Sequence, residues 1–397
     1  MSVSLRERSI RNGSGNRAPN APDWSLSPNS AARKQIEKTM SDIANALDKS
    51  VAAAKSTYAK VDPERLAAFL EKVFGAKVSL EEIGGGAAKS GSSSGILIFT
   101  ARIHRESKDE VKRLVLRYDP KSVHRLFVEY DLKSEFDLLS RLKKTSIAVP
   151  AVYGIDETGD DIGVVGFVME CVPGEPIPTS LFTSGPLVET NEVGRQAIYR
   201  DILRNLAKIH NLDHVALGLG NFTKKAEGRT PQEKLTNWWW KTWDWAKPKA
   251  HARLVPVRDW LLKNAPVVET PVLMHGDPNL GNYLLHQNRV AAMLDWELSS
   301  VGAPELDLAI QIVSMDPHRP HADKLPVSPP SEADWLMMYA DAGGKPLGEL
   351  DYYKVHACYE ILICMGSMST YLPEDIVAQY DAMSGFYWAL CERLMNK

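Results

Sequence analysis

The sequence predicts an α+β fold of two lobes, a small antiparallel sheet followed by a larger helical lobe. Between residues 77 and 118, strand-like apolar runs are separated by glycine-rich turns, which is typical of short antiparallel strands. From about residue 191 onward the apolar residues recur at helical spacing, apart from one hairpin near residue 285. A chain of 397 residues with 44% hydrophobic content can bury a core in each lobe.

Composition and charge argue against several classes of protein. The 47 basic and 50 acidic residues give a net charge of -3, so no general attraction to nucleic acid is expected. No run approaches the roughly 18 apolar residues of a membrane-spanning helix, so we expect no membrane partner. The four cysteines show neither metal-site spacing nor a dense disulfide pattern, which favours a reduced, cytoplasmic setting.

The first 75 residues are predicted to form a disordered tail and then N-terminal helices. Residues 1–30 are rich in Ser, Asn, Arg, Pro and Gly and can bury little, although the Arg and Ser content also permits an organelle transit peptide. Within residues 31–75, an apolar stripe from Ile36 to Leu47 predicts a helix that either docks on the body or forms a dimer contact. A second helix is expected to begin at Asp62-Pro63, a capping carboxylate followed by Pro.

The two lobes are predicted to divide near residue 172. Residues 76–172 form the strand-rich lobe, which ends where Pro173-Gly174 breaks the last strand, and residues 173–397 form the helical lobe. The elements expected in the first lobe are strands over residues 77–83, 95–103, 114–118, 151–155 and 164–172, and a helix over residues 130–144.

The residues that carry chemistry cluster between residues 272 and 309. Asn282 follows Asp277 by five residues, and Asp295 follows Asn282 by thirteen. The turn candidate Gln287-Asn288 separates two apolar runs, which predicts a hairpin. Folding about this turn sets Asn282 opposite about position 293, so that Asp295 lies diagonally across at about 7 to 8 Å.

Two oxygen-bearing side chains that converge in this way suit a cation. Magnesium favours carboxylate and amide oxygens at about 2.0 to 2.1 Å and completes its coordination with phosphate and water. Asp277, at the start of the loop, is placed to accept a proton from an attacking hydroxyl. Each residue alone is typical of an ordinary turn, whereas their joint spacing favours a phosphoryl-transfer site.

The same motifs resemble those of the aminoglycoside phosphotransferase and choline kinase-like superfamily, from about Pro63 to the C-terminus. The resemblance implies a protein-kinase-like two-lobed fold and an enzyme that uses ATP and Mg²⁺ to phosphorylate a hydroxyl of a small molecule. It also implies that Asp277 is the catalytic base, that Asn282 and Asp295 bind magnesium, and that His275, Glu297 and Asp307 brace the loop. The matching positions are His275-Gly276-Asp277, Asn282, Asp295-Trp296-Glu297, Gly302 and Asp307-Leu308-Ala309.

The resemblance also implies an ATP-binding loop in the N-terminal lobe. Glycine and serine runs at residues 84–86 and 90–95 lie between two predicted strands, where backbone N–H groups can approach phosphates. Gly85, Gly86 and Ser92 are the residues expected to bind phosphate. A flexible hairpin connection is the alternative interpretation of the same run.

Further ATP-binding candidates lie on the strands and the helix of this lobe. Arg117 stands where protein kinases carry a strand lysine, and it can hold phosphate oxygens through two nitrogens. Glu135 is its expected partner, or else a solvent-facing helix charge. Glu170 and Val172 resemble the connector that grips adenine, although an ordinary buried strand predicts the same residues. His210, by contrast, is expected to be a buried structural histidine.

The acceptor side is predicted from the segment of residues 224–258. This segment holds nine basic and three acidic residues, and the local excess of +6 (9 − 3) favours an anionic acceptor over a polycationic aminoglycoside. A solvated basic face is the alternative. The tryptophans have helical spacing and most should fill core space, with Trp239, Trp243 and Lys241 as acceptor-side candidates.

The Trp-rich helix and the Asp295-Trp296-Glu297 motif most resemble the branch of the superfamily that is fused to acyl-CoA dehydrogenases. This resemblance implies a hydroxyacyl-CoA or another anionic alcohol as the acceptor. An aminoglycoside resistance kinase and a non-catalytic nucleotide-binding module are the alternatives. The oligomeric state is left open, with a homodimer as one possibility.

Overall fold

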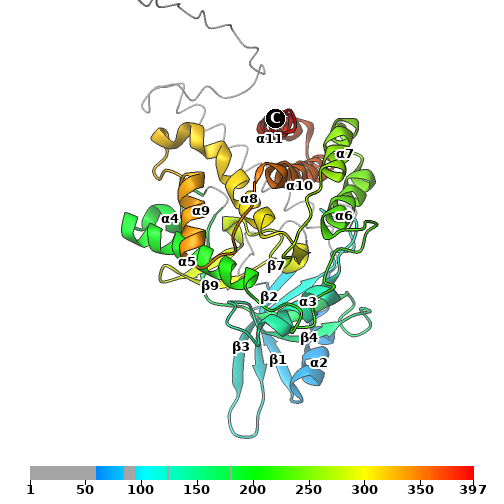
Figure 1. The fold of residues 1–397 in the computed structure, drawn as a ribbon. Helices are drawn as coiled ribbons and strands as arrows, with labels where there is room; N and C mark the ends of the chain where they lie inside the picture. Colours follow the sequence, from blue (N-terminus) through cyan, green and yellow to red (C-terminus); the bar gives the residue numbers. More distant parts are fainter. Residues whose placement is uncertain (1–59, 85–93, 123–124, 179–180) are drawn as a thin grey trace, which may run out of the picture.

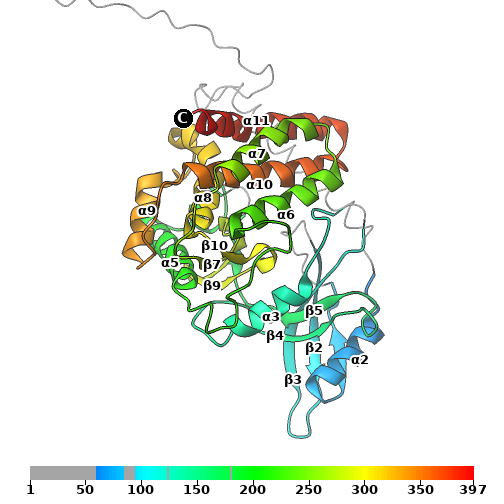
Figure 2. The same ribbon diagram turned by 45° about the vertical axis from the view of Figure 1, so that its right-hand side comes forward.

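The chain folds into two lobes, as a computed structural model shows for residues 60–84, 94–122, 125–178 and 181–397. In two views related by a 45° rotation, the sheet of the N-terminal lobe and the long helices of the C-terminal lobe lie at opposite ends (Figures 1 and 2). The predicted α+β two-lobed fold is therefore confirmed. The predicted tail, the helix expected before residue 60, and Gly85, Gly86 and Ser92 lie outside the described residues.

The N-terminal lobe is built on one five-stranded antiparallel sheet in the order β1-β2-β3-β5-β4. The central strand β3 pairs with β2 on one side and β5 on the other, so Arg117 lies opposite Ile96 and Phe167. Both neighbours fix its backbone, which gives the Arg117 side chain a rigid origin. The strands are β1 (Val78–Glu81), β2 (Gly95–Ile103), β3 (Glu110–Tyr118), β4 (Val152–Asp156) and β5 (Gly166–Glu170).

Helix α2 (Pro63–Phe74) belongs to the N-terminal lobe. Asp62 accepts a hydrogen bond from the N–H of Glu64, and Gly75 ends the helix in the left-handed conformation at φ 62°, as a C-terminal glycine commonly does. The predicted helix start is confirmed. Its buried face, which includes Leu66 and Leu70, packs in one core with the sheet, so the first lobe begins before residue 76.

Helix α3 (Leu132–Leu142) lies between the sheet and the C-terminal lobe (Figure 2). The side chain of Asp131 caps its first turn by accepting a hydrogen bond from the N–H of Ser134 at 3.1 Å. Leu138, Leu139 and Leu142 are at most 2% exposed and anchor the helix in the core. Glu135, in the first turn, is carried inward by this packing.

The C-terminal lobe is helical and has two apolar core clusters, one around α5 and the hairpin and the other around α6, α8 and α10. Its helices are α4 (Pro186–Glu189), α5 (Glu192–His210), α6 (Pro231–Ala246), α7 (Val255–Lys263), α8 (Pro304–Met315), α9 (Glu332–Asp341), α10 (Asp351–Ser369) and α11 (Glu374–Met395). Its short helices are η1 (His251–Leu254), η2 (Leu280–Asn282), η3 (Trp296–Leu298) and η4 (Asp316–Lys324). Its strands are β6 (Glu175–Pro176), β7 (Val272–Met274), β8 (Tyr283–His286), β9 (Arg289–Met293) and β10 (Ser300–Gly302).

The hairpin β8–β9 has the predicted two-residue turn. Gln287 and Asn288 have φ of 51° and 60°, the pair of positive values that a type I′ turn requires. The predicted register was wrong by one residue, since Met293 faces Tyr283 rather than Asn282. A β-bulge between Leu284 and Leu285 causes this shift, because it sets an extra residue on one strand.

Within the described ranges, the structure contains no helix that combines the length and the apolar character needed to cross a membrane.

Candidate active site

The loop that carries Asp277 begins with a conformation that favours glycine. Gly276, the second residue after β7, has φ of 88°, in the left-handed region. Two carboxylate oxygens of Asp307, at the start of α8, accept hydrogen bonds from the N–H groups of His275 and Gly276 at 2.8 and 2.9 Å. The backbone of the loop is thus held by a buried carboxylate and bends so that Asp277 leaves the strand.

We expect Gly276→Ala to unfold the loop. An added Cβ would lie 2.2 Å from the backbone oxygen of Leu298, which cannot rotate away, and the positive φ adds strain. The free energy of unfolding in urea should fall by about 3 kcal/mol or more. Gly385→Ala is the matched control, because nothing lies within 4 Å of its added Cβ. An equal, small effect of both substitutions would contradict this account of the loop.

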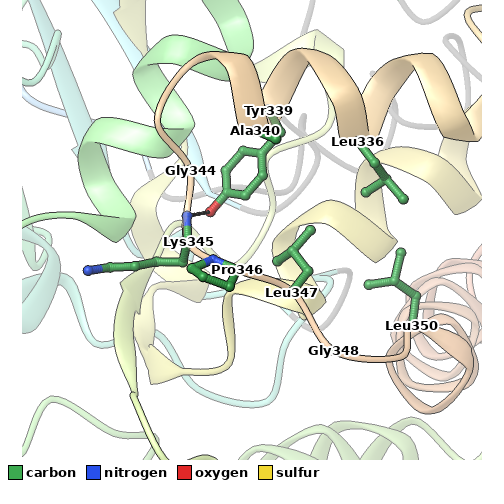
Figure 3. A pocket seen from close by; sticks show the side chains of 9 residues that line it. All are labelled: Leu336, Tyr339, Ala340, Gly344, Lys345, Pro346, Leu347, Gly348 and Leu350. Carbon is green, nitrogen blue, oxygen red and sulfur yellow. Dashed lines mark hydrogen bonds between the residues drawn. The ribbon is translucent and has the colours of Figure 1, made fainter.

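The side chain of Asp307 is held in place by a buried chain of hydrogen bonds that runs through His210 to Tyr339. Nε2 of His210 lies 3.0 Å from Asp307 Oδ2, and His210 Nδ1 lies 2.7 Å from the hydroxyl of Tyr339. His210 is 1% exposed, so it is a buried histidine that supports the loop, in keeping with its predicted structural character. Tyr339 in turn lines a surface hollow of about 420 Å³ between α9 and Leu350 (Figure 3).

The side chains of Asp277 and Asn282 are in direct contact. Asn282 Nδ2 donates to Asp277 Oδ2 at 2.9 Å and to the Asp277 carbonyl at 2.8 Å, and Asn279 Nδ2 donates to Asp277 Oδ1 at 2.7 Å. Burial raises the pKa of Asp277 to about 6, with a further rise from the charge of Asp295, while the two Asn hydrogen bonds oppose the change. A carboxylate with this pKa is ionised at neutral pH and still basic enough to accept a proton.

Asp295 lies at the start of η3 in a backbone conformation that few residues other than glycine adopt. Its φ of 66° is in the left-handed region, and such strain concentrates at functional sites. Asp295 Oδ1 accepts a hydrogen bond from Arg117 Nη2 at 2.9 Å. The N–H of Leu294 donates to the carbonyl of Asn282 at 2.8 Å, so the hairpin brings the Asn282 and Asp295 segments together, as predicted.

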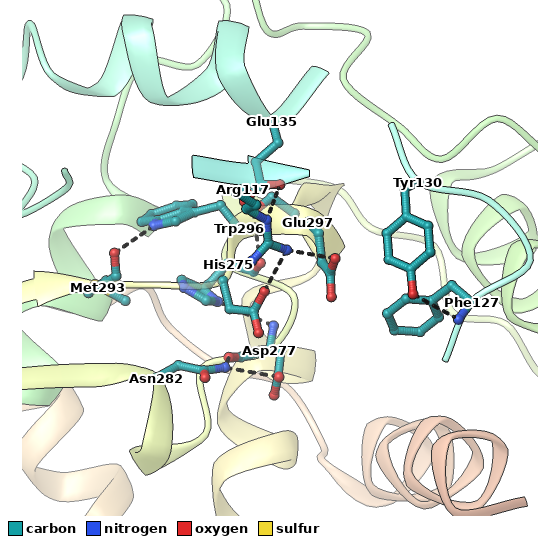
Figure 4. Close-up of polar contacts among 12 residues, drawn as sticks. Arg117, Phe127, Tyr130, Glu135, His275, Asp277, Asn282, Met293, Trp296 and Glu297 are labelled. Atoms are coloured by element: carbon teal, nitrogen blue, oxygen red, sulfur yellow. Dashed lines mark hydrogen bonds and ion pairs between the residues drawn. The ribbon is translucent and has the colours of Figure 1, made fainter. Parts of the chain in front are cut away.

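Arg117 joins the two lobes through three carboxylates (Figure 4). Its Nε donates to Glu135 Oε2 at 3.0 Å, and its Nη2 donates to Asp295 and to Glu297 Oε2, the latter at 2.7 Å. Burial lowers the pKa of Arg117, but the three carboxylates raise it more, so the guanidinium stays charged. Glu135 is 4% exposed and partners Arg117, so the alternative of a solvent-facing helix charge is wrong.

Asn282 and Asp295 have oxygens that suit a magnesium ion. Asn282 Nδ2 donates to both the carbonyl and the carboxylate of Asp277, so the Oδ1 of Asn282 is turned away from that carboxylate. Asp295 uses Oδ1 for Arg117, and its Oδ2 accepts no hydrogen bond within the described residues. One amide and one carboxylate oxygen form a hard donor set of the kind that magnesium prefers. The donors present therefore fit the predicted metal.

At the connector end of β5, Glu170 and Cys171 are the last of the described residues to form backbone hydrogen bonds before the chain reaches β6 (Glu175–Pro176). The N–H of Glu170 donates to Ala151, and the N–H of Cys171 donates to Arg113. Glu170 Oε2 also accepts from the N–H of Ala151 at 3.1 Å, so its side chain fastens β5 to the segment before β4. In the described part of the chain, Val172 makes no backbone hydrogen bond, which leaves it suited to a ligand.

Comparison with known proteins decides the family. Residues 101–347 match the family described as "Phosphotransferase enzyme family", a range that includes Arg117 and the whole Asp277 loop. The chain belongs to the phosphotransferase enzyme family. The prediction of a phosphotransferase is confirmed by this match.

Relatives of this phosphotransferase are acyl-CoA dehydrogenase family members, which is the branch that the sequence resembles. IBR3 of Arabidopsis thaliana, by name a probable acyl-CoA dehydrogenase, is 29% identical over 263 residues, which cover 60% of this chain and 31% of IBR3. Acyl-CoA dehydrogenase family member 10 of Mus musculus is 30% identical over 200 residues, 50% of this chain and 18% of that protein. The chain thus spans less than a third of the length of either relative.

Solved structures share the fold of this phosphotransferase. A candidate aminoglycoside phosphotransferase of Ralstonia eutropha JMP134 superposes with a TM-score of 0.61 at 21% identity, over 84% of this chain and 99% of the other. The aminoglycoside phosphotransferase APH(4)-Ia, in a ternary complex with AMP-PNP and hygromycin B, gives a TM-score of 0.51 at 15% identity over 83% and 97% of the two chains. The predicted kinase-like fold class is confirmed.

Two charged residues close to the phosphotransferase site, Glu360 and Lys224, were not predicted as site residues from the sequence. Glu360 on α10 is 5% exposed, and its charge contributes to the raised pKa of Asp277. Nδ1 of His356 lies 2.9 Å from Glu360 Oε1. Nζ of Lys224 donates to the carbonyl of Glu297 at 2.7 Å and lies 4.8 Å from the centre of the Trp238 ring. Neither Glu360 nor Lys224 belongs to a recognisable motif, so only the fold brings these two residues to the site.

The tryptophans proposed for the acceptor side lie in the core. Trp239 and Trp243 are each 1% exposed, and the Nε1 of Trp243 donates to the carbonyl of His251. This burial corrects the acceptor-side assignment of Trp243, since its ring packs against Gly366. Trp239 lies next to the buried carboxyl of Glu360, whose pKa it acts to lower while burial raises it. Most of the helical tryptophan pattern is therefore core packing, as the spacing predicted.

Within the described residues, six of the nine basic residues of the segment 224–258 form ion pairs, four of them with carboxylates far away in the sequence. The contacts pair Lys225 with Asp131, Arg229 with Glu233, Lys241 with Glu129, Lys249 with Glu374, Arg253 with Glu392 and Arg258 with Asp259. Most partners are distant in sequence, so a local count overstates the free positive charge. Lys241 Nζ also donates to the carbonyl of Lys225 at 2.8 Å, so this side chain holds a loop. The anionic acceptor stays a prediction.

Proposed function

We propose that this phosphotransferase moves the γ-phosphoryl group of ATP, with magnesium, to a hydroxyl of a small molecule. The observation that carries the proposal is the convergence of Asp277, Asn282 and Asp295, with Arg117 fixed against Asp295 from the opposite lobe. Phosphoryl transfer needs positioning, compensation of phosphate charge and one proton acceptor. Asp277, Asn282 and Asp295 of the C-terminal lobe, together with Arg117 of the N-terminal lobe, would supply these elements.

Each residue has a role in this proposal that follows from its contacts. Asp277 takes the proton of the attacking hydroxyl, and the Asn279 and Asn282 hydrogen bonds aim its carboxylate. Asn282 Oδ1 and Asp295 would hold magnesium, which when bound neutralises phosphate charge. Arg117 meets the phosphates from β3 while Glu135 holds its guanidinium in place. The loop of Gly85, Gly86 and Ser92 and the Val172 backbone are the remaining contacts proposed for ATP.

The acceptor that we propose is a hydroxyacyl-CoA or a related anionic alcohol. Support comes from the relatives, because the matching part of each belongs to a protein named as an acyl-CoA dehydrogenase family member. A kinase joined to such an enzyme would act on the same type of thioester. Solved structures of the fold include one bound to hygromycin B, so an aminoglycoside is the competing acceptor.

A panel of acceptors separates these possibilities. ADP release from MgATP would be measured with 3- and 4-hydroxyacyl-CoAs, the matching free hydroxy acids, choline and hygromycin B. We expect turnover with at least one hydroxyacyl-CoA to exceed that with its free acid by at least about tenfold. Turnover confined to hygromycin B would overturn the proposed acceptor and leave the phosphotransferase assignment intact.

A further inference from the structure

Two adjacent lysines, in a loop outside the phosphotransfer site, contact segments of both lobes that border the site. Lys224 and Lys225 lie between α5 and α6, in a segment without regular structure. Lys224 donates to the carbonyl of Glu297, two residues after Asp295. Lys225 Nζ lies 2.5 Å from Asp131 Oδ2, and Asp131 is the residue that caps α3. One dipeptide therefore contacts the segment after Asp295 and the start of α3.

These contacts close a ring that passes through Arg117. Arg117 is bound to Glu135 on α3 and to the carboxylate of Glu297. Asp131 begins the same helix as Glu135, and the two lysines lead from Asp131 back to the Glu297 backbone. The ring thus joins β3 and α3 of one lobe to two loops of the other.

The loop itself is fastened in ways that make it a rigid part of the ring. The N–H of Val301 donates to the carbonyl of Phe222 at 2.6 Å, which ties the loop to β10. Lys241 donates to the carbonyl of Lys225, and the ammonium of Lys224 lies over the Trp238 ring. Burial lowers the pKa of Lys224 to about 8, while Glu297, Glu360 and Glu135 act to raise it, so the ammonium is mainly charged at neutral pH.

We propose that Lys224 and Lys225 are positioning residues that hold α3 and the segment after Asp295 in the one arrangement that presents Arg117 to the nucleotide. This inference rests on the proposed function, because it concerns the affinity for MgATP. Neither lysine touches Asp277, Asn282 or Asp295 in the structure, so their effect is transmitted through Glu297 and α3. A shift of α3 would move Glu135 and leave Arg117 free to turn away from the phosphates.

The test measures MgAMP-PNP binding by calorimetry and hydrogen exchange of the α3 amides without nucleotide. Lys224→Met keeps an unbranched apolar side chain at this position and removes the ammonium that lies over Trp238, and we expect the Kd to rise about tenfold. Lys225→Met and Asp131→Asn should each raise the Kd about two- to threefold, since this pair is partly exposed. Asn remains a good helix cap, so Asp131→Asn removes only the charge. Lys225→Arg keeps the positive charge and should retain wild-type affinity.

The decisive result is non-additivity. The double variant Lys225→Met/Asp131→Asn should bind no more weakly than either single variant, and α3 should exchange about twofold faster in all three. Lys234→Met is the control, because Lys234 forms no ion pair within the described residues and should change neither readout. Additive effects, or unchanged α3 exchange, would overturn the inference. Absence of MgAMP-PNP binding to the wild-type protein would instead overturn the proposed function, and the exchange rates would still decide the role of the ring.

Discussion

Asp277→Asn is expected to reduce turnover by about 10³-fold while leaving nucleotide binding nearly unchanged. The substitution keeps the size of the side chain but removes its ability to accept a proton. Asn279 and Asn282 both donate to this carboxylate, so an amide can retain one of the two contacts and the loop should stay folded. Turnover by ADP release and MgAMP-PNP affinity by calorimetry are the two measurements.

A large loss of turnover with unchanged nucleotide affinity is the result that identifies Asp277 as a base. A residue that only binds nucleotide would raise the Kd and the KM for ATP together with any loss of rate. Asn264→Asp is a matched control in which the same two residue types are exchanged far from the loop, at the exposed end of α7. Residual turnover within about tenfold of wild type in Asp277→Asn would reject Asp277 as the base.

Arg117→Met is expected to lower the free energy of unfolding by about 3 to 5 kcal/mol. Methionine fills much of the same volume but leaves Glu135, Asp295 and Glu297 without their cation. Arg117 is 5% exposed, so water cannot replace the lost hydrogen bonds fully. Urea denaturation at pH 7 measures the effect.

The pH dependence of this loss gives a second check with a definite sign. Burial raises the pKa of Glu135 above 4.5 even beside Arg117, and removing the cation raises it further. A carboxyl group whose folded-state pKa is raised favours the folded state below the unfolded pKa and opposes it as pH rises. The defect of Arg117→Met should therefore be larger at pH 8 than at pH 5. Arg113→Met, on the exposed half of β3, should change stability by less than about 0.5 kcal/mol.

The fold was predictable because its signals are local. The cap at Asp62, the turn at Gln287-Asn288 and the apolar runs of β2 all act over a few residues. Strand β3 was predicted four residues too short, because its first residues are mainly exposed and carry no apolar pattern. The bulge at Leu284 was missed because nothing in the apolar runs on either side of the turn marks an extra residue.

The site was predictable only where its residues stand in one motif. Asp277 and Asn282 precede one hairpin and Asp295 follows it, so sequence spacing indicates that they meet. Lys224 and Glu360 approach the site from separate segments and depend on the packing of α6 and α10. The same limit explains the basic segment, whose compensating carboxylates come mostly from other helices and loops.

The most direct test of the account follows the γ-phosphoryl group itself by ³¹P NMR. MgATP would be incubated with a hydroxyacyl-CoA that supports ADP release, using wild-type protein and the Asp277→Asn variant. The account predicts a new phosphomonoester resonance that appears in step with ADP and is absent with the variant. Formation of inorganic phosphate alone, or an unchanged rate in Asp277→Asn, would contradict a transfer to a hydroxyl with Asp277 as its base.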